Sequence, residues 1–108
     1  VPLPQYEKTM ETKICEAIRE RLLIEFMYDA QIRIVEPYIL GTHKDTGSMV
    51  LLAYQVGGHI ENENAPLWKL YKVEKMGKMK LQEESFTTLR KGYKFDDSRF
   101  SKIRCQAE

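Results

Sequence analysis

The stretch "LIEFMYDAQIRIVEPYIL" (residues 23–40) carries the clearest structural signal in the chain. Apolar and polar residues alternate with a period of two on both sides of "DAQ" (residues 29–31), which is typical of a tight turn. This pattern predicts a β-hairpin with one face of each strand packed on a core. Pro37 lacks a backbone N–H, so we expect it to restrict the second strand to a sheet edge or to introduce a bend.

The segments around this hairpin predict one N-terminal helix and several further short strands. From Thr9 onward, Ile14, Ile18 and Leu22 recur at every fourth residue, as in an amphipathic helix. We expect a strand at 79–81 and a helical turn at 83–90. Alternation of apolar and polar residues predicts more strands at "MVLLAYQV" (49–56), "PLWKLYKVEKM" (66–76) and "SKIRCQ" (101–106). One helix and five or six short antiparallel strands predict a mainly β fold, either a small barrel or a strongly bent sheet, since closure removes exposed edges.

Length and composition fit a single globular domain. The chain has 108 residues, 43% of them hydrophobic, which supports a core and argues against disorder. Its longest apolar runs are too short to cross a bilayer, so we expect no membrane segment. The net charge of +1 conceals a split: residues 1–68 carry 6 Lys+Arg and 10 Asp+Glu, a balance of −4, whereas residues 69–108 carry 11 and 6, a balance of +5. This split predicts one basic face that attracts an anion, unless folding mixes the two halves.

Signatures of catalysis are absent from the sequence. His43 and His59 each lie in a polar loop without a Cys, Asp or Glu at metal-ligand spacing. Glu61 and Glu63 flank one residue of a loop rich in glycine and asparagine, which does not provide the rigid frame that acid–base chemistry requires. We therefore expect no enzyme, no catalytic residue, no metal and no cofactor.

The two cysteines, Cys15 and Cys105, also lack metal-ligand spacing. They form either one disulfide or two reduced thiols. The N-terminus has no pattern of a secretory signal, so we expect two reduced thiols and a cytoplasmic location.

Aromatic and basic residues are interleaved along the predicted strands. Aromatic rings stack on nucleobases and cations neutralise phosphates, so this pattern favours a binding surface for nucleic acid or a nucleotide. The alternative is structural, with tyrosines half-buried at a barrel rim and lysines extended along it. We expect Trp68 and Leu70 to pack beneath the helix. The candidate ligand-binding residues are Tyr28, Arg33, Tyr38, Tyr54, Lys69, Tyr71 and Lys72. Among these, Arg33, Tyr54, Lys69 and Tyr71 are expected to line one shared surface.

The order of the segments resembles the WYL domain family. The resemblance covers a helix and hairpin, "AIRERLLIEFMYDAQIRIVEPYIL" (residues 17–40) with its Glu-Pro-Tyr step, and then the apolar strand "MVLLAYQV". A strand of the type aromatic-Arg-Leu-Asp-Arg-Ile follows, here "WKLYKV" (68–73). The Trp-Tyr-Leu triplet is Met49-Val50-Leu51 in this chain, and both family arginines are lysines, which keep the charge but lack the guanidinium fork.

This resemblance implies a linker at 1–11, a small Sm-like or Src-homology-3-like β-barrel of five or six antiparallel strands at 12–82, and a C-terminal extension with a last strand at 83–108. It further implies a ligand-sensing module of a bacterial transcription regulator that binds nucleic acid or a nucleotide-like anion. Its expected associate is a helix-turn-helix DNA-binding domain or a partner protein. Residues 1–11 are too few for such a domain, so we expect an excised sensor or a free-standing member. The alternative is a protein-interaction or dimerisation module, forming a homodimer and binding no small ligand.

Overall fold

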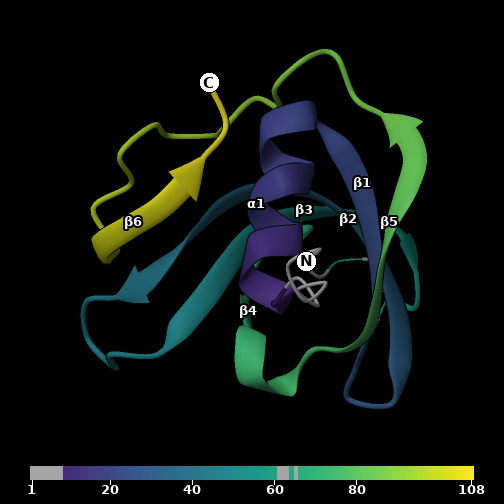
Figure 1. Ribbon diagram of the computed structural model, residues 1–108, viewed down its shortest axis with the longest axis horizontal. Helices are drawn as coiled ribbons and strands as arrows, with labels where there is room; N and C mark the ends of the chain where they lie inside the picture. Colours follow the sequence, from purple (N-terminus) through teal and green to yellow (C-terminus); the bar gives the residue numbers. More distant parts are fainter. Residues whose placement is uncertain (1–8, 61–63, 65) are drawn as a thin grey trace, which may run out of the picture.

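The computed structural model describes residues 9–60, 64 and 66–108 of a mainly β domain with one N-terminal α-helix (Figure 1). Residues 1–8 of the predicted linker and the loop carboxylates Glu61 and Glu63 lie outside the described residues. The elements are helix α1 (Met10–Glu20), strands β1 (Leu22–Tyr28), β2 (Gln31–His43), β3 (Met49–Gly58) and β4 (Trp68–Lys72), the short 3-10 helix η1 (Val73–Lys75), and strands β5 (Gly77–Ser85) and β6 (Phe100–Gln106). The predicted fold class is confirmed. The helical turn predicted at 83–90 is wrong, because 83–85 continue β5 and 86–90 have no regular structure.

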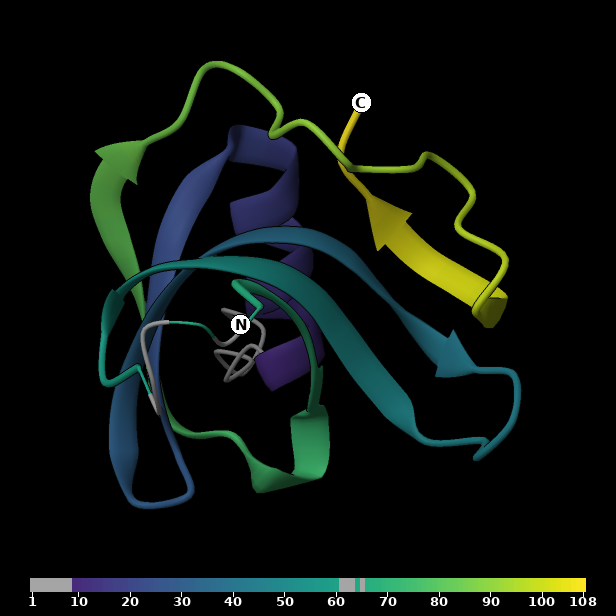
Figure 2. The ribbon, with the colours of Figure 1, turned by 180° about the vertical axis from the view of Figure 1, so that it is seen from behind.

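The six strands form one antiparallel sheet that bends around the helix. The order is β4-β3-β2-β1-β5, and β6 pairs with the second half of β2. Helix α1 lies between β6 on one side and β1 with β5 on the other (Figures 1 and 2). Strands β4 and β5, at the two ends of this order, do not pair with each other in the described part of the chain, so the sheet is bent but not closed.

Strand β2 is the centre of the sheet, and Pro37 explains how one long strand serves three neighbours. On one side β2 pairs with β1 over residues 31–35 and with β6 from Ile39 to His43, so Pro37 falls in the gap between these two ladders. On the other side its ladder with β3 shifts register between Pro37 and Ile39. A proline in this gap removes no hydrogen bond from either the β1 or the β6 ladder. The edge alternative for Pro37 is therefore wrong, and the bend is confirmed.

The hairpin between β1 and β2 has the tight turn that the sequence predicts. Tyr28 pairs with Gln31, so only Asp29 and Ala30 form the loop. Both have positive φ, 51° and 63° respectively. Two residues of positive φ are the mark of a type I′ turn, whose twist matches that of the two strands.

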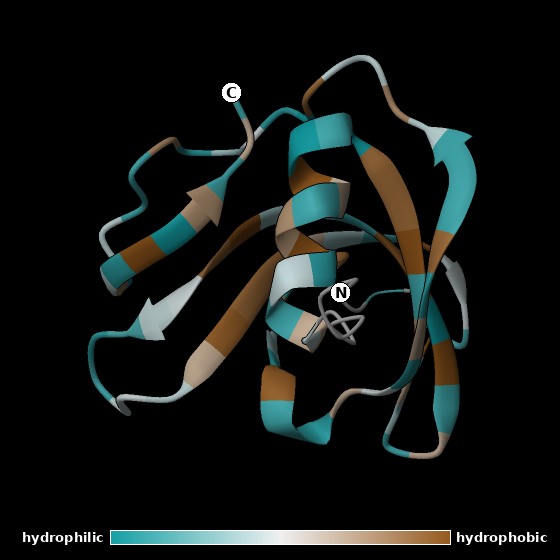
Figure 3. Ribbon diagram, in the orientation of Figure 1, coloured by the Kyte–Doolittle hydropathy of each residue, from teal (hydrophilic) through white to brown (hydrophobic). Residues whose placement is uncertain are grey.

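Helix α1 covers the sheet with the predicted apolar stripe. The hydroxyl of Thr9 accepts a hydrogen bond from the Thr12 N–H at 3.1 Å and so caps the first turn. Ile14, Ala17 and Ile18 are buried, while Leu22 begins β1 instead of extending the helix. Hydrophobic residues are concentrated on β1, β2 and β3, whereas the upper part of β5 is hydrophilic (Figure 3). None of the helices in the described ranges is long and apolar enough to cross a membrane.

A disulfide bond joins the helix to the last strand. Cys15 of α1 and Cys105 of β6 are bridged, with their Cα atoms 5.7 Å apart across a sequence separation of 90. The prediction of two reduced thiols is wrong, because nothing local in the sequence shows that α1 and β6 lie side by side. Disulfides persist mainly in oxidising environments, and the expected cytoplasmic location stays a prediction.

Candidate functional site

An aromatic cluster lies where β2, β3 and β4 meet the segment between β5 and β6 (residues 86–99), which we call the connection. Strand register places Glu36 beside Tyr54 and Tyr54 beside Trp68, so all three share one face of the sheet. The ring of Tyr38 lies 4.8 Å from Trp68 and 4.9 Å from Tyr93, measured between centroids. Tyr54 packs edge-on against Trp68 at 5.3 Å. We call the five rings the Trp68 cluster: Tyr38, Tyr54, Trp68, Phe86 and Tyr93.

An ion pair between buried Glu36 and the more exposed Arg90 holds the connection against this cluster. The carboxylate of Glu36 accepts hydrogen bonds from Arg90 Nε at 3.0 Å and Arg90 Nη2 at 3.1 Å, and from the Tyr38 hydroxyl at 2.9 Å. The backbone N–H of Arg90 donates to the Tyr38 hydroxyl at 2.9 Å. The guanidinium of Arg90 also lies 4.5 Å from the ring centroid of Tyr54, in cation–π contact. Burial, chiefly, raises the pKa of Tyr38, and the hydrogen bond to Glu36 raises the pKa of Arg90, so Tyr38 stays neutral and Arg90 charged.

The connection approaches Trp68 closely because of Gly92. This glycine has a φ of +97°, and a Cβ atom there would lie 3.2 Å from Trp68 Nε1. The indole N–H itself points to the Lys91 carbonyl oxygen at 3.4 Å. Only a glycine permits both the backbone conformation and this approach.

Trp68 forms one wall of a pocket of about 420 Å³, which we call the Trp68 pocket. Its charged groups are Lys94, Asp97 and Arg99. Asp97 and Arg99 form a two-point ion pair, with Nε–Oδ1 at 3.0 Å and Nη2–Oδ2 at 2.8 Å, which lowers the pKa of Asp97 and raises that of Arg99. Lys94 is exposed and pairs with no carboxylate of the described chain. The lining residues are Leu52, Trp68, Gly92, Lys94, Asp97, Ser98 and Arg99.

A second aromatic group lies in the interior, away from this pocket. The rings of Phe26, Tyr28 and Tyr71 meet edge-on, with Tyr71 5.0 Å from each of the other two. The guanidinium of Arg33 lies 6.0 Å from the ring of Tyr28. Arg33 and Tyr71 are only 2% and 1% exposed, so neither is presented to a ligand from outside.

The candidate residues predicted from the sequence are therefore divided. Tyr38 and Tyr54 belong to the Trp68 cluster, whereas Tyr28, Arg33 and Tyr71 form the interior group. Lys69 and Lys72 both lie in β4 and are half-buried. Lys69 is opposite Ala53 of β3, and the backbone N–H of Lys72 donates to the Tyr28 hydroxyl at 3.1 Å.

The expectation that Arg33, Tyr54, Lys69 and Tyr71 line one surface is wrong. Tyr54 lies opposite Trp68 in the β3–β4 ladder, so these two side chains share one face of the sheet. Tyr71 is three residues after Trp68 in β4, so its side chain points to the other face. The expectation that Trp68 packs beneath the helix is also wrong, because its ring neighbours come from β2, β3 and the connection.

Several residues of this site were missed because they lie in a segment without periodicity. Arg90, Gly92, Tyr93, Lys94 and Arg99 all belong to the connection, which the sequence indicated only as an extension. One signal was present: "KGYK" (residues 91–94) interleaves basic and aromatic residues as "WKLYK" (68–72) does. The two stretches lie in contact in the structure.

Comparisons of the chain with protein-family models, with curated proteins and with solved structures found no match. The resemblance to the WYL domain therefore remains a prediction from the segments quoted above.

Proposed function

We propose that this domain is a ligand-binding module whose Trp68 pocket takes one nucleotide unit, either from single-stranded nucleic acid or from a nucleotide-like anion. The observation that carries the proposal is the placement of a half-buried indole in one pocket wall beside two cations, Lys94 and Arg99. An aromatic side chain next to Lys or Arg is the combination with which small β domains hold single strands, because every base has a face that stacks and every nucleotide has a phosphate.

Size and charge support the same ligand class. A pocket of about 420 Å³ lies within the range of small-molecule sites. Lys94 and Arg99 against Asp97 leave one net positive charge on its lining. All three belong to residues 69–108, the part of the sequence with a balance of +5. The net positive charge of the lining therefore attracts an anion to the pocket.

The regulatory role forms the second part of the proposal and is supported by the segment order shared with the WYL family. In this role the domain senses its ligand for a bacterial transcription regulator, with a DNA-binding domain or a partner protein reading the bound state. The connection between β5 and β6 is the element suited to report binding, because it contributes most of the pocket lining and is fastened to the sheet through Arg90. A cytoplasmic setting belongs to this proposal, and the thiol state of Cys15 and Cys105 in cells tests it.

Trp68 provides a direct test, since it is the only tryptophan in the chain. We expect short single-stranded oligonucleotides and cyclic dinucleotides to change its fluorescence in a saturable titration at low salt. With the phosphate of one nucleotide unit neutralised by the pocket, the logarithm of the affinity for a single strand should fall with the logarithm of the salt concentration with a slope of about −0.7. Lys94→Ala, which removes the net positive charge of the lining, should weaken binding and make it nearly independent of salt. Lys75→Ala is the matched control, because Lys75 is also exposed but lies beyond the other end of β4.

Two outcomes would contradict the site. Binding that is lost in Lys69→Ala or Lys72→Ala but unchanged in Lys94→Ala would place the ligand elsewhere on β4. The proposed function would be excluded if no nucleotide changed the fluorescence of Trp68 and if a labelled oligonucleotide showed no change in anisotropy when the protein was added.

A second candidate function, self-association, is favoured by a separate observation. Ile32, Val56 and Ile60 are 46%, 39% and 41% exposed. The His59 N–H donates to the Ile32 carbonyl at 2.8 Å, which holds the end of β3 beside the start of β2. Exposed apolar side chains grouped in this way mark contact surfaces. Sedimentation over a range of concentrations, with Ile32→Lys as the variant, distinguishes a homodimer from a monomer.

A further inference from the structure

A second cavity, of about 850 Å³, lies between α1 and β6, and the disulfide forms part of its wall. Both Cys15 and Cys105 line this cavity and are half-buried. It shares no lining residue with the Trp68 pocket. The α1–β6 cavity is lined by Thr12, Cys15, Ile18, Arg19, Arg21, Ile103, Arg104, Cys105, Gln106 and Glu108.

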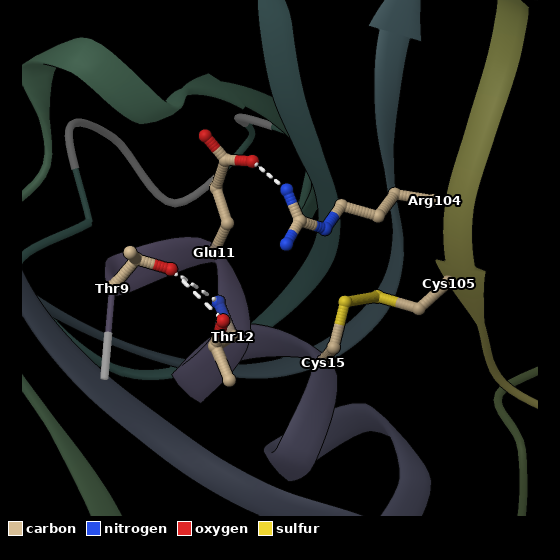
Figure 4. The surroundings of a disulfide bond; sticks show 6 residues. All are labelled: Thr9, Glu11, Thr12, Cys15, Arg104 and Cys105. Carbon is tan, nitrogen blue, oxygen red and sulfur yellow. Dashed lines mark hydrogen bonds and ion pairs between the residues drawn. A yellow bond between two sulfur atoms is a disulfide. The ribbon is translucent and has the colours of Figure 1, made fainter. Parts of the chain in front are cut away.

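Arginines are the dominant charged groups around this disulfide. Arg104 extends from β6 to pair with Glu11 of α1, next to the bridge between Cys15 and Cys105 (Figure 4). Arg21 donates to the main-chain oxygen atoms of Thr87, at 2.7 Å, and of Glu108. Arg19 is exposed and has no partner within the described ranges.

The carboxylates near the cavity do not cancel this charge. Glu108 lines the cavity, and Glu11 pairs with one of its arginines. Counting side chains alone, three arginines face these two carboxylates around the bridge.

We propose that the α1–β6 cavity is a site of thiol–disulfide exchange with small anionic thiols, that is, thiols that also carry carboxylate or sulfonate groups. The thiolate of the small molecule attacks one sulfur of the bridge. A new S–S bond forms between the attacker and that cysteine, the Cys15–Cys105 bond breaks, and the electron pair leaves on the other cysteine as a thiolate, which takes a proton from water. A second molecule of the thiol then attacks the mixed disulfide, so that two small thiols are oxidised to their disulfide and the protein gains two cysteine thiols.

The arginines promote this exchange in two ways. They concentrate an anionic thiol in the cavity, and they stabilise the cysteine thiolate that leaves, because neighbouring cations lower a thiol pKa and a better leaving group departs faster. Arg104 is adjacent to Cys105 in β6, and Arg19 lies one helical turn from Cys15. Neutral or cationic thiols gain only the second effect.

The test compares three thiols on the folded, oxidised protein: 2-mercaptoethanesulfonate (anionic), 2-mercaptoethanol (neutral) and cysteamine (cationic). Rates of bridge opening are followed by mass spectrometry of trapped thiols, and each is divided by the rate of the same thiol with a small model disulfide. We expect the normalised rate for the anionic thiol to exceed that for the neutral one about threefold to tenfold at low salt. The preference should disappear at high salt.

Variants distinguish the cavity from a general effect of net charge. Arg19→Gln should reduce the anionic preference, and Lys13→Gln should not, because Lys13 lies on the same helix but does not line the cavity. Arg104→Lys, which keeps the charge, should retain more of the preference than Arg104→Gln. Equal normalised rates for all three thiols overturn the proposal. Opening that occurs only as fast as global unfolding, measured by hydrogen exchange, overturns it as well.

Discussion

Glu36 and Arg90 hold the connection between β5 and β6 against the sheet through a two-point ion pair, with Nε–Oε1 at 3.0 Å and Nη2–Oε2 at 3.1 Å. Glu36 is only 4% exposed, and the ion pair crosses 54 positions of sequence. The pair brings Tyr93 and Gly92 to Trp68, so the shape of the Trp68 pocket depends on it. The Glu-Pro-Tyr step of β2 has a physical role here: it supplies the carboxylate and the hydroxyl that receive Arg90.

Replacing Glu36 tests this relationship. Glu36→Gln keeps the side-chain volume but removes the charge, so we expect a loss of about 1–3 kcal/mol in the free energy of unfolding, at the lower end because Arg90 regains water. Glu25→Gln is the matched control, since its ion pair with Lys80 is longer, at 3.9 Å, and more exposed than the Glu36–Arg90 pair, and should contribute less than about 1 kcal/mol. Urea denaturation measures both, and equal losses would show that the Glu36–Arg90 pair does not anchor the connection.

Gly92 provides a test of how closely the connection packs on the indole. Gly92→Ala should cost about 1–3 kcal/mol and shift the emission of Trp68, because the new methyl group meets Nε1 and the positive φ strains the backbone. Gly47→Ala separates the two causes, since Gly47 also has a positive φ, +72°, but a Cβ there meets nothing within 4 Å. We expect Gly47→Ala to show the backbone cost alone, with unchanged Trp68 emission. The same emission shift in both variants would contradict the contact.

The β1–β2 turn offers a stabilising substitution. Ala30 has a φ of +63°, which disfavours any residue with a Cβ, so Ala30→Gly should raise the free energy of unfolding by about 0.5–1 kcal/mol. Ala30→Val should lower it, because a branched side chain is least tolerated in this conformation. Thermal unfolding of the two variants beside the wild type measures the order, and a destabilising Ala30→Gly would contradict the I′ geometry.

Stability in alkali should depend on Tyr93. Burial, chiefly, raises its pKa from 10.0 to about 12, and its hydroxyl donates to the Ala107 carbonyl at 2.7 Å. A raised pKa in the folded state means that the contribution to stability is complete below pH 10 and is lost as the pH rises toward about 12. Tyr93→Phe should lower stability by about 1 kcal/mol at neutral pH and make the alkaline decline shallower.

Denaturation curves recorded across this pH interval test the prediction. Tyr38, whose pKa is also raised, remains in the variant, so part of the decline should persist. Parallel declines in the wild type and in Tyr93→Phe would mean that Tyr93 ionises equally well in the folded and unfolded states.

Sequence periodicity predicted the N-terminal helix and the strands, but it did not predict which residues form the Trp68 pocket. The helix stripe of Ile14 and Ile18, the β1–β2 turn and the strand at Trp68 depend on neighbours within a few residues, so they follow from local patterns. The Trp68 pocket depends on the connection, which has no regular period and is placed by contacts with residues far away in the sequence, such as those of Arg90 with Glu36 and Tyr38. Because two register shifts interrupt the β2–β3 ladder, alternation along one strand does not show which side chains share a pocket with those of another.

By itself, the sequence determined that this chain forms one helix and a set of short antiparallel strands, because helix and strand periods are local properties of the chain. Only the tertiary structure decided that Cys15 meets Cys105, that Arg33 and Tyr71 are buried, and that Trp68 lies beside Lys94. These pairings join residues that are far apart along the chain, and they depend on how the bent sheet packs against α1 and the connection. The positive and aromatic side chains that the sequence predicted to lie together are separated by the two faces of the sheet. The residues that do form the pocket precede β5 in the sequence, as Trp68 does, or follow it, as Lys94 does.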